Sequence, residues 1–176
     1  MNERLRGFAS AGWFSACGLP LEPSDFSGAK FYLAALGVHP SVRVEPVASW
    51  EHAERIIRNP AWDMSWWERE ESERKALFQL CIQRVGEPEA VETLSLAVGV
   101  EHQIIHAAAT TAASRLGVTD LSIVGAASGA ASMAAHGRAL ALLAEVGDEH
   151  VFVRKYSLFE GGRWPLGLVN GAFHLF

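Results

Sequence analysis

Residues 151–176, VFVRKYSLFE GGRWPLGLVN GAFHLF, decide the fold class of this chain. The first part of this stretch is rich in β-branched and aromatic side chains, which favour strands. Gly161-Gly162 is a plausible two-residue hairpin turn, and Asn170-Gly171 is the strongest short hairpin signal a sequence can carry. We therefore predict an antiparallel three-stranded meander. Its strands are expected at 151–160, 163–169 and 172–176.

Two prolines constrain the predicted sheet. Pro165 falls in the middle strand of the meander, where it cannot donate a ladder hydrogen bond, so we expect a bulge or a later strand start there. Earlier in the chain, Val42, Val44 and Pro46 alternate with charged residues and predict a short strand near 42–46. Pro46 places this additional strand at an edge of the sheet.

Helical patterns fill most of the sequence before residue 150. Apolar residues recur at helical spacing between capping residues and Gly or Pro stops. Ser65 and Glu68 form a capping box, and Gly99 weakens or breaks the helix that begins at Pro88. Residues 121–124 fit a buried strand or a first helical turn equally well. The predicted helices cover 25–40, 50–58, 65–85, 88–98, 100–116 and 126–146.

The order of these elements, helices first and strands last, predicts a mostly helical α+β fold with five or six helices and a small C-terminal sheet. The 176 residues fit a single globular domain, 1–176, without repeats or linkers. The chain is 49% hydrophobic, which excludes intrinsic disorder. No apolar run approaches the ~18 residues of a membrane span. We expect a soluble, cytoplasmic protein without a membrane partner.

Two cysteines, Cys17 and Cys81, belong to no CxxC motif, so zinc knuckles and thioredoxin-type sites are excluded. The segment around Cys17 is similar to a bacterial lipoprotein cleavage box, but the preceding apolar stretch 8–16 is short and interrupted by serines. We interpret the segment as ordinary folded chain with reduced thiols. Cys81 lies on an apolar helix face and is expected to be an inert core thiol.

The net charge of −5 is concentrated in the middle of the chain. Residues 61–100 carry a net charge of −4, whereas residues 151–176 carry +2. This mild acidity argues against binding of nucleic acid, which needs clustered Lys and Arg. The run 68–75 is charged on every side of its helix, so we predict that it projects from the body of the protein. An acidic helix face can steer a basic partner.

Tryptophans are the most unusual feature of the sequence. Trp62, Trp66 and Trp67 lie within six residues, at the start of the charged helix. They can form a local mini-core, because each buries ~150–250 Å² when enclosed. Alternatively they form a partner-facing patch with Arg69 and Arg74 on its polar rim, since Trp and Arg dominate binding hot spots.

A second candidate surface lies in the C-terminal segment. Arg163 and Trp164 follow the predicted hairpin turn at Gly161-Gly162, where side chains are displayed rather than buried. The last residues, His174 to Phe176, are largely apolar. We therefore expect Phe176 to be docked in the sheet.

The best candidate for a metal site is the pair His102 and His106. Two histidines four residues apart share a helix face, as they do in zinc-binding helices. The full HExxH motif fails, because Gln103 occupies the position of the general-base Glu. The alternative is a pair of structural histidines that bond to backbone carbonyls. A third ligand would come from His136, His150 or His174.

The small-residue stretch 121–137 carries no charge. Within it, residues 125–129 are similar to a phosphate-binding loop or a hydrolase elbow, but GxxxxGK[ST] and GxSxG both fail. We predict instead that Gly125 and Gly129 let a neighbouring helix approach closely.

Two functional hypotheses follow from these features. The first is a non-enzymatic protein-binding protein of interaction or inhibitor type, without a cofactor, that holds a partner protein on its acidic, Trp-rich helix surface. The alternative is a small metal-dependent enzyme with a divalent transition metal such as zinc at His102 and His106. Both are compatible with a homo-oligomer.

Overall fold

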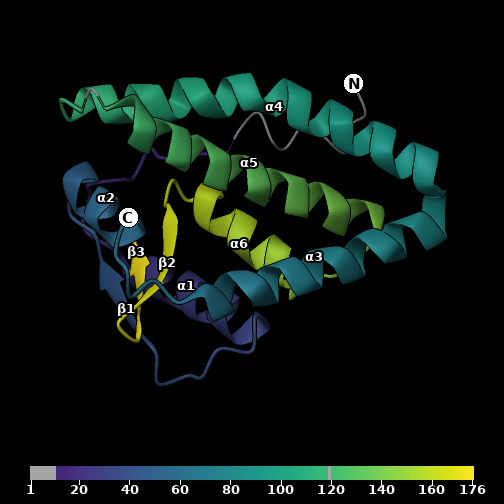
Figure 1. The fold of residues 1–176 in the computed structure, drawn as a ribbon, viewed down its shortest axis with the longest axis horizontal. Coiled ribbons are helices and arrows are strands. Elements are labelled where there is room, and N and C mark those ends of the chain that lie inside the picture. Colours follow the sequence, from purple (N-terminus) through teal and green to yellow (C-terminus); the bar gives the residue numbers. More distant parts are fainter. Residues whose placement is uncertain (1–10, 119) are drawn as a thin grey trace.

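A computed structural model describes residues 11–118 and 120–176. Within these ranges it contains six helices and three strands (Figure 1). The mostly helical α+β class predicted from the sequence is confirmed. The elements are α1 (Pro23–Ala35), β1 (Arg43–Pro46), α2 (Trp50–Ile57), α3 (Met64–Val85), α4 (Glu87–Arg115), α5 (Leu121–Leu143), α6 (Val151–Glu160), β2 (Pro165–Val169) and β3 (Ala172–Leu175).

The strands form one mixed sheet with the order β1-β3-β2. β3 pairs parallel with β1 and antiparallel with β2, so the predicted antiparallel meander is wrong. Its first hairpin turn is also wrong, because Gly161 is the C-cap of a helix. The predicted final hairpin is confirmed, because Asn170 and Gly171 join β2 to β3 with φ of 51° and 72°, the positive values that a tight primed turn needs. The predicted edge strand near 42–46 is confirmed as β1. Pro165 opens β2, which is an edge strand and not the middle of a meander, so its missing N–H is tolerated.

The prediction of a strand over 151–160 is wrong, because this segment is helix α6. As a strand it would place Lys155 and Phe159 on one face but Arg154 and Phe152 on the other. As a helix it packs between α1 and α5 and buries most of its side chains, so tertiary burial overrides the local β propensity. The buried residues of α6 are Val151, Phe152, Val153, Lys155, Tyr156, Leu158 and Phe159.

Several helix boundaries differ from those expected, and α1 ends at Ala35, five residues before the predicted end. α4 runs unbroken through Gly99, because the cost of one glycine, about 1 kcal/mol, is small in a long helix packed on α5. Residues 121–124 are the first turn of α5. α3 begins at Met64, and its N-cap is Asp63, whose carboxylate accepts from the Ser65 N–H at 2.9 Å. The capping box expected at Ser65 is therefore wrong.

The sheet lies at one end of the molecule, with α1 and α2 beside it (Figure 1). α4 and α5 lie side by side along one edge of the molecule, and α6 lies between α5 and α1. The sheet end is dominated by aromatic rings, of which Trp50, Trp164 and Phe176 contact one another. Phe176 is fully buried, as predicted, and exchanges two backbone hydrogen bonds with Trp164. Among the described helices, none combines the length and apolarity needed to cross a bilayer.

The close helix approach predicted at Gly125 and Gly129 is wrong. A Cβ added at either position would meet no atom within 4 Å, since both glycines face outward. The close approach occurs instead at Gly137, where a Cβ would lie 2.9 Å from the Phe152 ring of α6. Ala127, Ala131, Ala134 and Ala135 belong to the buried face of α5.

Part of the N-terminal segment compared with a lipoprotein cleavage box, residues 1–10, lies outside the described residues. Cys17 is buried and packs in the core cluster.

Candidate functional site

A pocket of about 230 Å³ opens between α3, α5, α6 and the start of β2. Its walls are mainly apolar, and Met133 and Gly129 supply the side formed by α5. Four tryptophans line it: Trp62, Trp66, Trp67 and Trp164. Its charged lining residues are Glu70, Arg74 and Lys155.

The charged start of α3 does not project from the body, and the prediction for 68–75 is wrong. Glu70 is only 2% exposed, because it continues the buried stripe of α3 that runs from Trp66 to Leu77. Its carboxylate forms an ion pair with the buried Lys155 of α6, with Nζ 2.6 Å from Oε2. Because of this ion pair, a helix whose sequence is charged on every side can bury one of its carboxylates against a neighbouring helix. The sequence signal was the i, i+4 spacing of Trp66 and Glu70.

Glu70 belongs to a chain of hydrogen bonds that crosses three helices. The Tyr32 hydroxyl of α1 donates to Glu70 Oε1 at 2.6 Å and accepts from the Trp66 Nε1–H at 2.7 Å. Burial and the adjacent Glu70 raise the pKa of Tyr32 well above its usual value, so the phenol stays protonated and remains a donor. Lys155 Nζ also lies 5.1 Å from the centre of the Trp66 ring, within range of a cation–π contact.

Trp62 is positioned by the edge strand β2. Its Nε1–H donates to the Leu166 carbonyl at 3.2 Å, and its ring meets Trp66 edge-on at 5.3 Å. Gly167 permits this approach, because a Cβ there would lie 2.7 Å from the Trp62 Nε1. The mini-core interpretation therefore describes Trp62 and Trp66, and the partner-facing patch stays a prediction. Trp62 and Trp66 form an inner wall, whereas Trp67 is 44% exposed at the rim.

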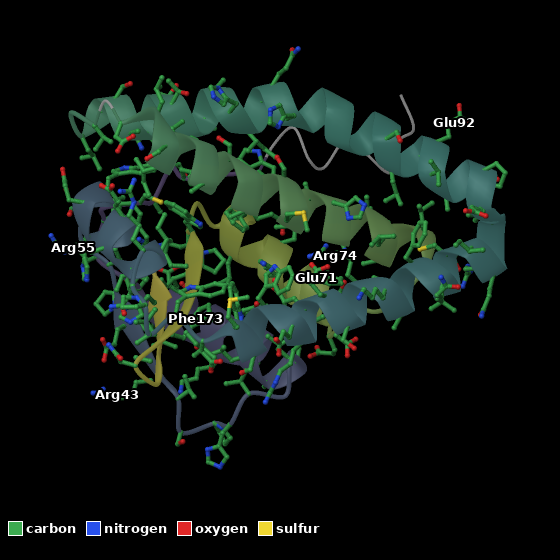
Figure 2. All side chains as sticks on the ribbon, viewed as in Figure 1. Arg43, Arg55, Glu71, Arg74, Glu92 and Phe173 are labelled. Atoms are coloured by element: carbon green, nitrogen blue, oxygen red, sulfur yellow. The ribbon has the colours of Figure 1, made fainter. Side chains whose placement is uncertain are left out.

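Arg74 forms the polar corner of the pocket. Its Nε donates to Glu71 at 3.1 Å, and its guanidinium lies 4.8 Å above the Phe152 ring. A longer bond of 3.5 Å reaches the Met133 carbonyl of α5. Figure 2 shows Glu71 and Arg74 on the side of α3 that faces α5 and α6. Arg74 therefore bridges the two helices on either side of the pocket.

Three of the predicted binding residues have other partners. Arg69 is exposed but donates to the Gly37 carbonyl at 2.7 Å, away from the pocket lining. Arg163 and Trp164 are 3% and 2% exposed, so the displayed surface expected for them is wrong. They follow the end of helix α6, which turns them inward. The Trp164 ring still lines the floor of the pocket.

His102 and His106 lie on the exposed face of α4 with ring centres 6.4 Å apart. Within the part of the chain that the structure describes, no three potential metal ligands come together. The third ligand that the metal hypothesis needs is therefore not assembled around this pair. Metal binding by His102 and His106 remains a prediction.

The two cysteines are free and buried. Burial raises the pKa of Cys17 to about 12, and its Sγ lies 3.5 Å from the Phe176 carbonyl. Cys81 donates to the Leu140 carbonyl at 3.3 Å, and burial raises its pKa as well. A raised pKa keeps both groups as thiols near neutral pH, and only the thiolate is a strong nucleophile.

No family model, curated protein or solved structure matches this chain at the required significance. Function is therefore argued from the pocket itself. The sequence analysis named all four lining tryptophans, with Trp164 assigned to a separate surface, and placed Arg74 on the polar rim. It missed the buried Glu70 and Lys155, and Tyr32 behind them.

Proposed function

We propose that this protein binds a partner protein, and that its tryptophan pocket takes up an apolar side chain of that partner. The observation that carries the proposal is the apolar rim of the pocket. Trp67 and Met133 both line the pocket and are 44% and 41% exposed. Met64, one helical turn before Trp67, extends the exposed apolar surface. Trp and Met are enriched at protein interfaces, where an anchor side chain fills a pocket surrounded by such contacts.

The size of the pocket also favours a side chain. Pockets for drug-sized molecules usually enclose ~300–1,000 Å³, whereas this one holds about 230 Å³. A single large side chain with a surrounding protein contact matches that volume better than a cofactor does.

The charge of the surrounding surface suggests how a partner is attracted. Glu68 and Glu73 are exposed on α3, and residues 61–80, which contain the start of α3, carry a net charge of −2. Such a field accelerates the encounter with a basic protein surface and is weakened by salt. We therefore expect the partner to present basic residues around its apolar anchor.

The test is quantitative affinity capture from native cells with the wild type and two variants. Trp67→Ala removes the exposed rim, whereas Leu80→Ala removes an equally exposed apolar side chain of the same helix, about 20 Å away. A partner that recognises the pocket is captured by the wild type and by Leu80→Ala, and is lost with Trp67→Ala. It must then bind the wild type as a purified protein. Identical capture by all three proteins would contradict the proposal.

A further inference from the structure

The charged residues of the pocket differ in how much hydrogen-bonding capacity they have left. Glu70 already accepts one strong bond on each oxygen, from Tyr32 and from Lys155. The Lys155 ammonium has three N–H donors, and in the described residues Glu70 is its hydrogen-bond acceptor. Donors therefore exceed free acceptors on the polar side of the pocket.

The net charge of the lining points the same way. Among the lining residues, Lys155 and Arg74 are cationic and Glu70 is anionic, so the wall carries one net positive charge. Glu71, which pairs with Arg74, is not part of the lining. The Arg74 guanidinium has five N–H donors; Nε donates to Glu71 and Nη1 makes the long bond to the Met133 carbonyl, so donors on Nη1 and Nη2 remain for a ligand. A ligand that brings one negative charge next to Arg74 and Lys155 complements this wall.

The apolar part of the pocket determines which uncharged group of a ligand fits there. Trp62 and Trp66 present ring surfaces at right angles to each other, with an interplanar angle of 86°. Flat apolar groups pack well against such rings. Gly129 on α5 also lines the pocket, and the absence of a side chain there leaves open space for such a group.

We propose that the pocket binds an apolar ring with a carboxylate beside it, the ring against Trp62 and Trp66 and the carboxylate on Lys155 and Arg74. This inference rests on the proposed function. In a protein partner, an apolar side chain and a carboxylate are attached to the same carbon only at the C-terminal residue. A partner chain that ends in an aromatic residue therefore fits the site, and a free aromatic acid shares the same chemistry.

Lys155 does not have to leave Glu70 for this binding. One N–H stays on Glu70, and another is available to a ligand oxygen. The bonds to the ligand are charge-assisted and enclosed by apolar walls, which makes them stronger than the same bonds in water.

The test is calorimetric titration of the full chain with three probes. They are the tripeptide Gly-Gly-Phe with a free carboxylate, the same peptide with an amidated C-terminus, and phenylacetate. Loss of one charge-assisted hydrogen bond corresponds to at least about tenfold in affinity. We expect the free acid to bind at least about tenfold more tightly than the amide.

Two pairs of variants locate the binding. Arg74→Gln should remove most of the preference for the acid, whereas Lys75→Gln, which removes an exposed charge at the next position of α3, should leave it unchanged. Gly129→Leu should fill the pocket and abolish binding. Gly125→Leu places the same side chain in open space one turn earlier, outside the lining, and should bind as the wild type does.

The outcomes separate this inference from the proposed function. Equal affinity for acid and amide, both lost in Gly129→Leu, would overturn the carboxylate inference and leave the pocket as the binding site. Failure of all three probes would overturn the inference, while affinity capture with Trp67→Ala still decides the proposed function. Phenylacetate binding as tightly as the free peptide would support the shared chemistry and assign it to a small acid.

Discussion

Two buried cations, Arg163 and Lys155, are held in opposite ways. Arg163 donates from Nη1 and Nη2 to the carbonyls of Ala16, Leu19 and Pro20 at 2.6–2.9 Å. It also forms an ion pair with Asp25 at the start of α1. The guanidinium is thus surrounded by acceptors and fastens the segment before α1 to the end of α6.

Lys155 has one carboxylate partner and lies on the wall of a pocket. Arg163 is not part of that lining. A buried cation whose donors are all used stabilises the fold, because removing it leaves several acceptors without partners. A buried cation with donors to spare beside a pocket can also serve a ligand. This contrast separates a structural region of the molecule from its proposed binding region.

The largest expected effect on stability comes from the region around Arg163, whose donors are all used. Arg163→Met leaves Asp25 without its cation and removes a donor from each of three carbonyls, so we expect it to lower the free energy of unfolding by about 3–5 kcal/mol. Arg163→Lys should recover only part of this, because one ammonium cannot reach all the acceptors of the planar guanidinium. Urea unfolding of the three proteins measures the effect. A loss below about 1 kcal/mol in Arg163→Met would contradict the structural role.

The corresponding substitution of Lys155 in the pocket should lower the free energy of unfolding by less. Lys155→Met leaves Glu70 without its cation, but Tyr32 still donates to that carboxylate and the pocket admits water. We expect a loss of about 3 kcal/mol, the lower end of the range for a broken buried ion pair. The double variant Glu70→Gln/Lys155→Met should recover much of it, since no charge is then left unpaired. If the double variant is less stable than Lys155→Met, the ion-pair account fails.

Two glycines of α5 extend the contrast between closed and open regions. Gly137→Ala forces a Cβ to within 2.9 Å of the Phe152 ring and should destabilise by about 1–3 kcal/mol. Gly129→Ala points into open space and should stabilise the helix by up to about 1 kcal/mol. Thermal unfolding gives both signs directly. Changes of the same sign would show that the two glycines do not differ as described.

The smallest effect concerns pH near the pocket. Burial and the nearby Arg74 lower the pKa of His136 on α5 below 6.5, despite the opposing effect of Glu71. The unfolded chain then binds more protons than the folded one, so stability is lost as the pH falls through about 6.5. The urea midpoint should decrease from about pH 8 to about pH 5, and less steeply in His136→Gln. The exposed His106→Gln is the control and should follow the wild type.

Local signals in the sequence were sufficient to predict the edge strand β1 and the final hairpin. Asn170-Gly171 forms a turn that few other residue pairs adopt. The helix predicted over 50–58 is α2, and Ser49 caps it by accepting from the His52 N–H at 3.2 Å. In both cases the interacting atoms lie within a few residues of each other.

The site could not be predicted in the same way, because it depends on contacts between residues that lie far apart in the sequence. Glu70 and Lys155 are 85 residues apart, and each looks like a surface residue until the other is placed beside it. α6 was missed for a related reason, because its β-branched and aromatic residues are good strand formers whose helix forms by burial against α1 and α5. The tryptophans were recognised as unusual, but which of them turn inward depends on Tyr32 and on β2.

The central claim is that the tryptophan pocket beside Lys155 is a binding site. Nitrogen–proton correlation spectra of the tryptophan indoles test it directly, with the free-acid peptide Gly-Gly-Phe as the probe. The indole signals of Trp62, Trp66 and Trp67 should shift on titration, that of Trp13, which lies outside the pocket lining, should stay in place, and Gly129→Leu should abolish the shifts. Shifts that persist in Gly129→Leu, or that centre on Trp13, would contradict the account.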